Sequence, residues 1–169
     1  MNMLLSGQMA VIPIVTIPSP ILREKLHQLP VEEVGSEKIN DLAAHMRETM
    51  VAANGVGLAA NQVNKNVQLF IIDEKLALEN NVPNAFINPE ITEYSREEEE
   101  IEEGCLSIPK VYIPIKRSKK IKIKALDLEG NKIKFKARGF LARVLQHETD
   151  HLNGIVIKDR QKKDSGEST

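Results

Sequence analysis

The chain has 169 residues, of which 41% are hydrophobic and 28% charged, and its net charge is −1. This length and composition predict one folded domain with a substantial core and exclude an intrinsically disordered chain. A charge so close to zero gives no overall attraction to nucleic acids or membranes. The single cysteine excludes an internal disulfide and favours a reducing compartment. The N-terminus lacks the basic and apolar segments of a signal peptide, so we expect a cytoplasmic protein without a membrane span.

The first half of the chain is predicted to hold one long helix between short extended segments. Ser36 is a favourable N-terminal cap, and the apolar residues after it recur at helical spacing until Asn54 and Gly55 end the helix. The Ser-Pro pair at residues 19–20 starts at most a short helical turn. The extended segments expected here are residues 12–17, 67–72 and 84–91.

The sequence GVGLAANQ at residues 55–62 follows this helix directly. It superficially matches the glycine-rich loop of dinucleotide-binding proteins, but that loop follows a strand and opens a helix. The two glycines and two alanines instead indicate backbone brought close to another group, with Gln62 as the polar residue at the end. A plain turn between a helix and a strand is the alternative.

The second half is predicted to contain a β-hairpin and then a helix. Residues 96–103 are strongly acidic, and Glu97 to Glu100 are expected to form a solvated edge or loop. Lysines alternate with apolar residues over 119–127 and again over 132–136, which predicts a hairpin with one face on the core. These lysines lack interleaved aromatic residues, so we interpret them as the solvated face rather than a nucleic-acid site. A helix follows Gly139 and ends at the Asn-Gly pair at 153–154. The expected fold class is α+β, with mixed or antiparallel strands packed around this C-terminal helix in a single compact domain.

The run QHETDH at residues 146–151 lies on this last helix. Two histidines four residues apart share one helical face, so His147 and His151 can bind a single metal ion. Glu148 lies beside that ion without needing to bind it, which is the HExxH arrangement of metal-dependent hydrolases with glutamate as the general base. A surface helix with two chance histidines is the alternative, but only four histidines exist and two fall at this spacing around a glutamate.

A catalytic metal site also needs a third protein ligand and an open position for water. The acidic residues downstream, at positions 159, 164 and 167, lie in a polar tail that is expected to be too mobile to hold an ion. Cys105 is the upstream candidate, because the glycine before it and the polar residues on either side indicate a special backbone site. The alternative for a lone cysteine is a small buried hydrophobic residue.

Three stretches together resemble, in order, the three signature motifs of peptide deformylase: residues 55–62, 103–107 and 146–151. The resemblance covers roughly residues 12–158. It implies a hydrolase that removes the N-formyl group from the N-terminal formylmethionine of newly synthesised proteins and releases formate. The expected organisation is a deformylase-like catalytic domain at 1–158, including an N-terminal extension at 1–11, and a mobile polar tail at 159–169.

The resemblance also implies a cofactor and partners. The family's metal is Fe²⁺, with Ni²⁺, Co²⁺ or Zn²⁺ as substitutes, whereas the donor set alone would suggest zinc. The implied partners are N-formylmethionyl nascent peptides. Any ribosome contact would have to be made without the long C-terminal helix of other bacterial members, because a short polar tail is expected here. The source can be bacterial, organellar or viral.

The residues and the resemblance together imply a mechanism. Cys105, His147 and His151 hold the ion, and a water in the fourth position loses a proton at neutral pH because the metal lowers its pKa. The metal-bound hydroxide attacks the formyl carbon, while Glu148 accepts the water's proton and later returns it to the leaving amine.

By resemblance, the side-chain amide of Gln62 and the backbone N–H of Leu106 stabilise the oxyanion. A salt bridge between Glu103 and Arg117 is expected, also by resemblance, to brace the cysteine segment. The residues expected to contact the substrate or to line its methionine slot are Val56, Gly57, Phe140 and Arg143.

Two other classes of protein remain open at this point. A metallopeptidase that cuts internal peptide bonds would share the metal helix but would leave Cys105 and Gln62 unexplained. A non-catalytic metal or nucleic-acid binding module is the second, although a structural zinc would need a fourth protein ligand and the chain has no second cysteine.

Overall fold

The computed structural model describes residues 10–164, and the side chains of residues 10–161. The helices and strands are α1 (Glu37–Ala52), β1 (Gly57–Ala59), β2 (Leu69–Ile72), α2 (Glu74–Glu79), β3 (Ala85–Tyr94), β4 (Glu98–Cys105), β5 (Ile108–Ser118), β6 (Lys120–Leu126), β7 (Lys132–Arg138), α3 (Gly139–Leu152) and α4 (Ile157–Asp164). Short 3-10 helices occur at Pro20–Arg23, Val31–Glu33 and Ala60–Val63.

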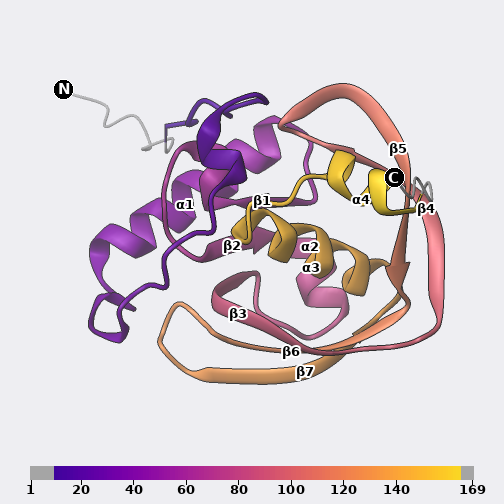
Figure 1. Cartoon of the computed structure of the whole chain (residues 1–169). Coiled ribbons are helices and arrows are strands. Elements are labelled where there is room, and N and C mark those ends of the chain that lie inside the picture. Colours follow the sequence, from indigo (N-terminus) through magenta and orange to yellow (C-terminus); the bar gives the residue numbers. More distant parts are fainter. Residues whose placement is uncertain (1–9, 165–169) are drawn as a thin grey trace.

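The strands form two antiparallel sheets around α3. The larger sheet has the order β1-β2-β3-β6-β7, and β4 pairs with β5 in a separate two-stranded sheet. Helix α3 contacts the strands of the larger sheet and also β5 of the smaller one. Figure 1 shows α3 in the middle of the fold, with β6 and β7 below it and β4 and β5 to its right. This arrangement confirms the expected α+β domain with a central C-terminal helix.

The main core lies between α1, the larger sheet and α3. The residues that α1 turns inwards are Ile39, Ala43, Met46, Thr49 and Met50. Phe70 and Phe86 stack on neighbouring strands of the sheet with ring centroids 4.9 Å apart. A smaller cluster joins β5 to α4 and consists of Ile108, Ile113, Ile115, Val156 and Ile157. The second cluster matters for the site because it attaches α4 to the same strand that leads away from Cys105.

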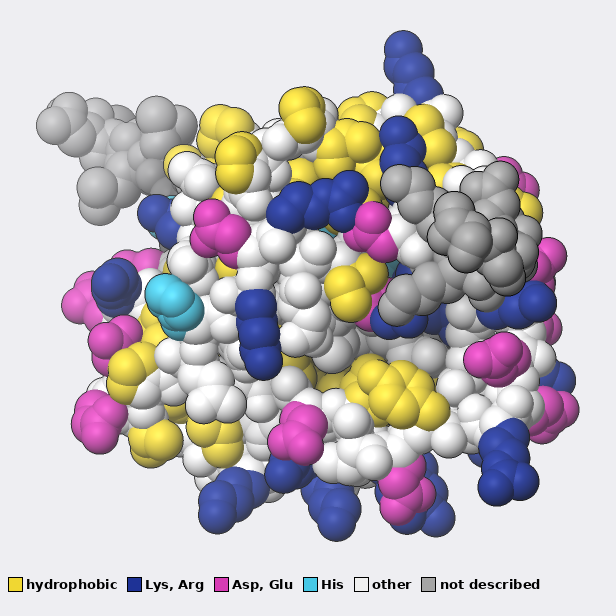
Figure 2. Space-filling model, in the orientation of Figure 1, with side chains coloured by type: hydrophobic (Ala, Val, Ile, Leu, Met, Phe, Trp, Pro, Cys, Tyr) yellow, Lys and Arg dark blue, Asp and Glu magenta, His cyan; other side chains and the backbone are white. Residues whose placement is uncertain are grey.

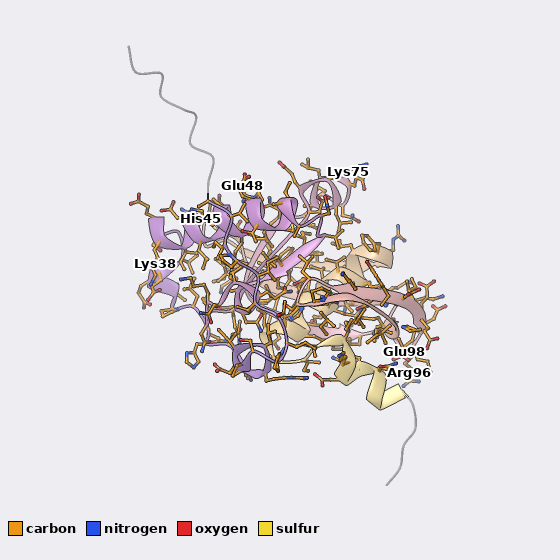
Figure 3. The ribbon with its side chains drawn as sticks, turned by 90° about the horizontal axis from the view of Figure 1, so that it is seen from above. Lys38, His45, Glu48, Lys75, Arg96 and Glu98 are labelled. Carbon is orange, nitrogen blue, oxygen red and sulfur yellow. The ribbon has the colours of Figure 1, made fainter. Side chains whose placement is uncertain are left out.

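The helix signals in the sequence are confirmed. The Ser36 hydroxyl accepts a hydrogen bond from the backbone N–H of Ile39, which caps α1. Asn54 has a φ of +56° just after α1, and Gly154 has a φ of +72° just after α3. These left-handed conformations end both helices where the sequence predicts. Figure 3 shows His45 on α1 at the edge of the molecule.

The predicted hairpin is also confirmed. Strands β6 and β7 pair so that Ile121 lies opposite Ala137 and Ile123 opposite Phe135 on the face turned to the core. The lysines between them form the outer face. Figure 2 shows Lys and Arg side chains projecting along the lower edge of the molecule, where Figure 1 places these two strands.

Glu97 to Glu100, expected as a solvated edge or loop, are exposed, and from Glu98 onwards the acidic segment is an edge strand rather than a loop. Strand β4 pairs with β5 from Glu98 opposite Ser118 to Glu103 opposite Ile113. Its other glutamates are exposed while Glu103 is buried, so the strand is stabilised by backbone pairing and by one inward side chain rather than by an apolar face. Strand β5 was not predicted, because two prolines within residues 108–118 interrupt its alternating pattern.

The expected mobile tail from residue 159 is wrong for residues 159–164, which belong to α4. The Asp159 carboxylate accepts a hydrogen bond from the backbone N–H of Val156 and forms an ion pair with Arg23, so α4 is capped and anchored at its start. Residues 165–169 and residues 1–9 of the expected N-terminal extension lie outside the described part of the chain. Within residues 10–164, no helix has the length and apolar character needed to cross a membrane.

Candidate metal centre and active site

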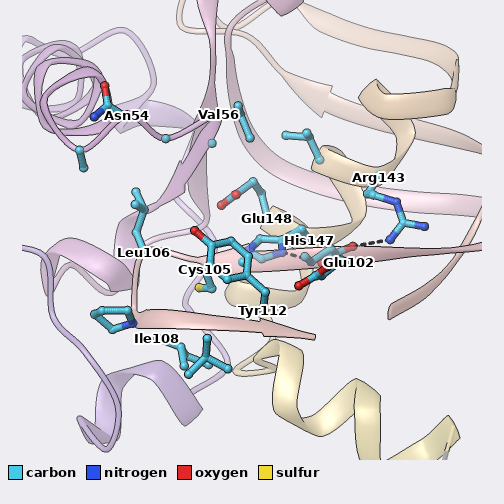
Figure 4. A pocket seen from close by; sticks show the side chains of 18 of the residues that line it. Asn54, Val56, Glu102, Cys105, Leu106, Ile108, Tyr112, Arg143, His147 and Glu148 are labelled. Atoms are coloured by element: carbon cyan, nitrogen blue, oxygen red, sulfur yellow. Dashed lines mark hydrogen bonds and ion pairs between the residues drawn. The ribbon is translucent and has the colours of Figure 1, made fainter. Parts of the chain in front are cut away.

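The three predicted metal ligands lie together in the structure. Helix α3 places His147 and His151 one turn apart, with ring centroids 5.0 Å apart. Cys105 is the last residue of β4, and its Sγ lies 3.3 Å from Nε2 of His151. One donor atom from each of the three residues lies within 4.8 Å of the other two. Residues that are far apart in the sequence therefore converge at one place, and Figure 4 shows Cys105 close to His147 there.

The donor set fits a divalent transition metal. Glu103 accepts a hydrogen bond from Nδ1 of His147 at 3.0 Å, which turns the lone pair of Nε2 of this ring towards the other donors. One thiolate and two imidazoles suit Zn²⁺ and related divalent ions, and three protein ligands leave a position for a reactant.

The pKa shifts of the two histidines also favour metal binding. Burial holds the pKa of His151 well below its usual range, so this ring is neutral and can act as a ligand. Burial lowers the pKa of His147, but its hydrogen bonds with Cys105 and Glu103 outweigh burial and raise the pKa to about 10. Surroundings that attract a proton so strongly also attract a metal cation in its place.

Glu148 is buried beside this cluster. Its Oε2 has no hydrogen-bond partner among the described residues, and burial is the largest of the effects that raise its pKa to about 7. Gly57 of β1 lies directly against it, since a Cβ built on Gly57 would lie 2.5 Å from Oε1 of Glu148. A buried carboxyl group that changes its charge near neutral pH is suited to accept and return a proton.

Gln62, the last residue of the GVGLAANQ stretch, lies beside the metal donors. Its Oε1 accepts a hydrogen bond from the N–H of Ala59 at 2.9 Å, and its Nε2 donates to the hydroxyl of Ser107 at 3.1 Å. The same Nε2 lies 3.8 Å from Sγ of Cys105. The amide is therefore held in one orientation, with its donor towards the cysteine. Leu106 follows Cys105 in the turn between β4 and β5 and is half-buried.

A cavity of about 540 Å³ opens over these residues. It is lined by the loop after α1, by β4 and β5, and by one face of α3, and Figure 4 shows Cys105, His147 and Glu148 pointing into it. The four residues expected at the substrate all line this cavity: Val56, Gly57, Phe140 and Arg143. Val56 is 46% exposed and Phe140 57% exposed, which leaves apolar surface free at the mouth.

Glu103 is the centre of a buried network of charges. Arg117 donates to its carboxylate through Nε at 2.7 Å and through Nη2 at 3.0 Å, as the expected brace requires. Arg143 donates to Oε1 of the same carboxylate at 2.7 Å, so its guanidinium is buried rather than at the surface. Burial raises the pKa of Glu103, but hydrogen bonds from His147 and Arg117 outweigh it and hold the pKa well below its usual range.

Sequence reasoning missed three members of this site. Asp150 accepts from Nη1 of Arg117 at 2.7 Å, and Arg160 of α4 donates to the same carboxylate. Ser107 orients Gln62. Asp150 could have been found, because it lies three residues after His147 on the same helical face. Arg160 could not, because it reaches Asp150 only in the folded structure, and no local pattern links these two residues.

Comparison with known proteins identifies the family. A family model described as polypeptide deformylase matches residues 11–166. The chain belongs to the polypeptide deformylase family. A peptide deformylase of Acinetobacter baumannii (strain SDF) is 46% identical over 151 residues, which are 89% of this chain and 83% of that protein. A peptide deformylase of Dictyoglomus thermophilum is 48% identical over 144 residues, which are 85% of this chain and 88% of that protein.

Solved structures of deformylases share the fold. A crystal structure of peptide deformylase from Thermotoga maritima superposes with a TM-score of 0.81 at 40% identity and covers 89% of this chain and 97% of that one. The actinonin-bound class I type b peptide deformylase from Acinetobacter baumannii gives a TM-score of 0.82 at 37% identity, covering 89% of this chain and 97% of that one. The resemblance found in the sequence is therefore confirmed, and the chain is a hydrolase of a metal-dependent family.

Proposed function

We propose that this chain removes the N-formyl group from formylmethionyl peptides at the ends of newly synthesised proteins and releases formate. The observation that carries the proposal is the position of Glu148. A buried carboxyl group lies beside three convergent metal donors, at the base of a cavity that Gln62 also reaches. In support, a related deformylase from Acinetobacter baumannii has been solved with Met-Ala-Ser bound, and it gives a TM-score of 0.82 at 34% identity.

Cys105, His147 and His151 would hold the metal, for which we propose Fe²⁺, with Ni²⁺, Co²⁺ or Zn²⁺ as substitutes. A bound divalent ion supplies Lewis-acid chemistry and lowers the pKa of a neighbouring water towards neutrality. Glu103 keeps His147 in the tautomer that offers Nε2.

Glu148 moves the proton. Its carboxylate accepts one proton from the attacking water as the water oxygen bonds to the formyl carbon. The C–N bond then breaks as Glu148 returns this proton to the departing amine, so the products are formate and a free amino terminus. A pKa of about 7 suits both halves of this exchange near neutral pH.

Gln62 and Leu106 stabilise the negative charge that develops on the formyl oxygen. Nε2 of Gln62 is already oriented by Ala59 and Ser107, so it needs no reorganisation at the moment of reaction. The backbone N–H of Leu106 is the second donor. Each such donor is worth about 3 kcal/mol of transition-state stabilisation.

The cavity binds the rest of the substrate. The apolar side chains of Val56 and Phe140, with the methylene groups of Arg143, form the slot for methionine. Gly57 allows the peptide backbone to approach because it has no side chain. A formyl carbon carries only hydrogen, so a tight fit at Glu148 excludes larger acyl groups.

Formate release from formyl-Met-Ala-Ser tests this proposal, with acetyl-Met-Ala-Ser and a longer unblocked peptide as controls. We expect only the formyl peptide to react, and we expect Glu148→Gln to bind the same amount of metal while turning over at least about 100-fold more slowly. Cleavage of the unblocked peptide would instead favour a metallopeptidase. A Glu148→Gln variant as fast as the parent would remove this residue as the general base.

A further inference from the structure

Helix α4 reaches into the charge network through one residue. Arg160 donates to the Asp150 carboxylate through Nε at 2.9 Å and through Nη2 at 2.5 Å, a two-pronged contact that fixes the carboxylate in position and rotation. Asp150 belongs to α3, between the two predicted histidine ligands. The contact therefore joins the last helix of the chain to the metal-binding one.

The network continues from Asp150 to a metal donor. Oδ2 of Asp150 accepts from Nη1 of Arg117 at 2.7 Å. The other nitrogens of Arg117 hold both oxygens of Glu103, and Oε2 of Glu103 accepts from Nδ1 of His147. Each carboxylate and each guanidinium in this series makes two or more contacts, so a shift of one member changes the geometry of the next.

Burial differs along this series of contacts: the contacts of Arg117 are buried, whereas the contact made by Arg160 is at its solvent-exposed end. The side chains of Arg117 and Glu103 are 3% and 7% exposed, and that of Asp150 is 11% exposed. Arg160 is 33% exposed and lines a hollow that also reaches Arg117 and Asp150. Arg160 therefore lies between solvent and the Asp150–Arg117 pair. Without it, water would reach this pair and weaken it.

We propose that Arg160 is a positioning residue for the metal centre, which acts through Asp150, Arg117 and Glu103 to hold the His147 ring in its ligating orientation. The proposal rests on the proposed metal site, but it concerns retention of the ion and not the reaction itself. It gives α4, which lies outside the three sequence motifs, an indirect effect on the metal through this series of contacts.

The alternative is that Arg160 merely anchors α4. The chain offers a matched control, because Arg23 forms a second ion pair to α4, through Asp159, and among the side chains of residues 10–161 this pair has no hydrogen bond to the network. Arg23→Gln loosens the same helix and leaves the series from Asp150 to His147 intact.

The experiment loads the parent, Arg160→Gln, Arg160→Lys and Arg23→Gln with Co²⁺ and follows transfer of the ion to an excess of a chromogenic chelator. Thermal unfolding of each metal-free protein and formate release are measured separately. We expect Arg160→Gln to release Co²⁺ on the order of three- to tenfold faster than the parent, less than the 10- to 100-fold typical of a residue that contacts a ligand directly. Arg160→Lys should fall between the two, and Arg23→Gln should release the ion at the parent's rate.

Equal release rates for Arg160→Gln and the parent would overturn the proposal, and so would an equal acceleration by Arg23→Gln. A Glu103→Gln background gives a second test, because Arg160→Gln should add nothing to the release rate once Glu103 no longer holds His147. Faster release from Arg160→Gln with no formate from any protein would reject the proposed function and support this inference. Failure of the parent to retain Co²⁺ would reject the inference.

Discussion

Gly57 and Glu148 lie so close that no side chain fits between them. A Cβ built on Gly57 would lie 2.5 Å from Oε1 and 2.8 Å from the carboxyl carbon of Glu148. The glycine-rich loop therefore does more than bring backbone near a substrate: it leaves room for the group proposed as the general base.

Gly57→Ala should displace the Glu148 carboxyl group and reduce formate release by about 100-fold or more, the contribution expected of a positioned general base. Bound metal should be unchanged, because the three donors come from other residues. Gly55→Ala is the matched control, since its added methyl would come closer than 3.4 Å only to the movable end of the Leu106 side chain, at 2.8 Å, and would lie 3.4 Å from Cγ of Met50 and 3.6 Å from the backbone oxygen of Gly57. Equal activity of Gly57→Ala and the parent would show that the carboxyl group can act from another position.

Gln62→Leu should lower kcat by roughly 10²- to 10³-fold, because one oxyanion donor is lost. It should also lower the free energy of unfolding by about 1–3 kcal/mol, since the N–H of Ala59 is left buried without its acceptor. Gln68→Leu removes another buried glutamine, whose side-chain nitrogen donates to the backbone oxygen of Leu26. The second variant should lose stability and keep its kcat; a parallel loss of kcat in both would refute a specific role for Gln62.

Arg117→Ala should destabilise the fold by about 3–5 kcal/mol in urea unfolding, because it leaves the buried carboxylates of Glu103 and Asp150 without their shared partner. Bound metal should fall as well, since Arg117 no longer fixes the Glu103 carboxylate that orients His147. Lys119→Ala, which breaks the solvent-exposed pair with Glu97, should change neither quantity. Unchanged stability and metal content in Arg117→Ala would contradict the brace.

Cys105→Ser should reduce metal affinity strongly, because a hydroxyl replaces a thiolate ligand. The loss should exceed the roughly 10- to 100-fold expected when a residue that only hydrogen-bonds to a ligand is removed. The measurement is bound metal after dialysis against a series of chelator concentrations. His45→Ala, a histidine on α1 outside the site, is the control and should keep its metal. Full retention of metal by Cys105→Ser would exclude the thiolate as a ligand.

Much of the site could be predicted because helical periodicity is local. Once residues 139–152 are helical, the relative positions of His147, Glu148 and His151 follow from their spacing alone. The approach of Cys105 has no such local cause, since it depends on how β4 packs against α3. Cys105 was nevertheless predicted as the third ligand, first from its setting between a glycine and polar residues and then from the motif resemblance, and the structure brings the three residues together.

The missed parts of the fold have physical reasons. Strand β4 has no apolar stripe, because its stability comes from pairing with β5 and from Glu103 alone among its glutamates being buried. Helix α4 is polar along most of its length and is held by ion pairs to Arg23 and Asp150. Such long-range contacts leave no periodic trace in the sequence.

The two sheets share no hydrogen-bonded strand pair among residues 10–164. Cys105 is the last residue of β4 in the smaller sheet, whereas His147 and His151 belong to α3, which packs against the larger sheet. A cation bound by Cys105, His147 and His151 would link the β4–β5 ribbon to the rest of the protein. Loading the ion should therefore slow amide hydrogen exchange along that ribbon far more than in α1, and metal loss would free the ribbon before the remainder of the fold opens.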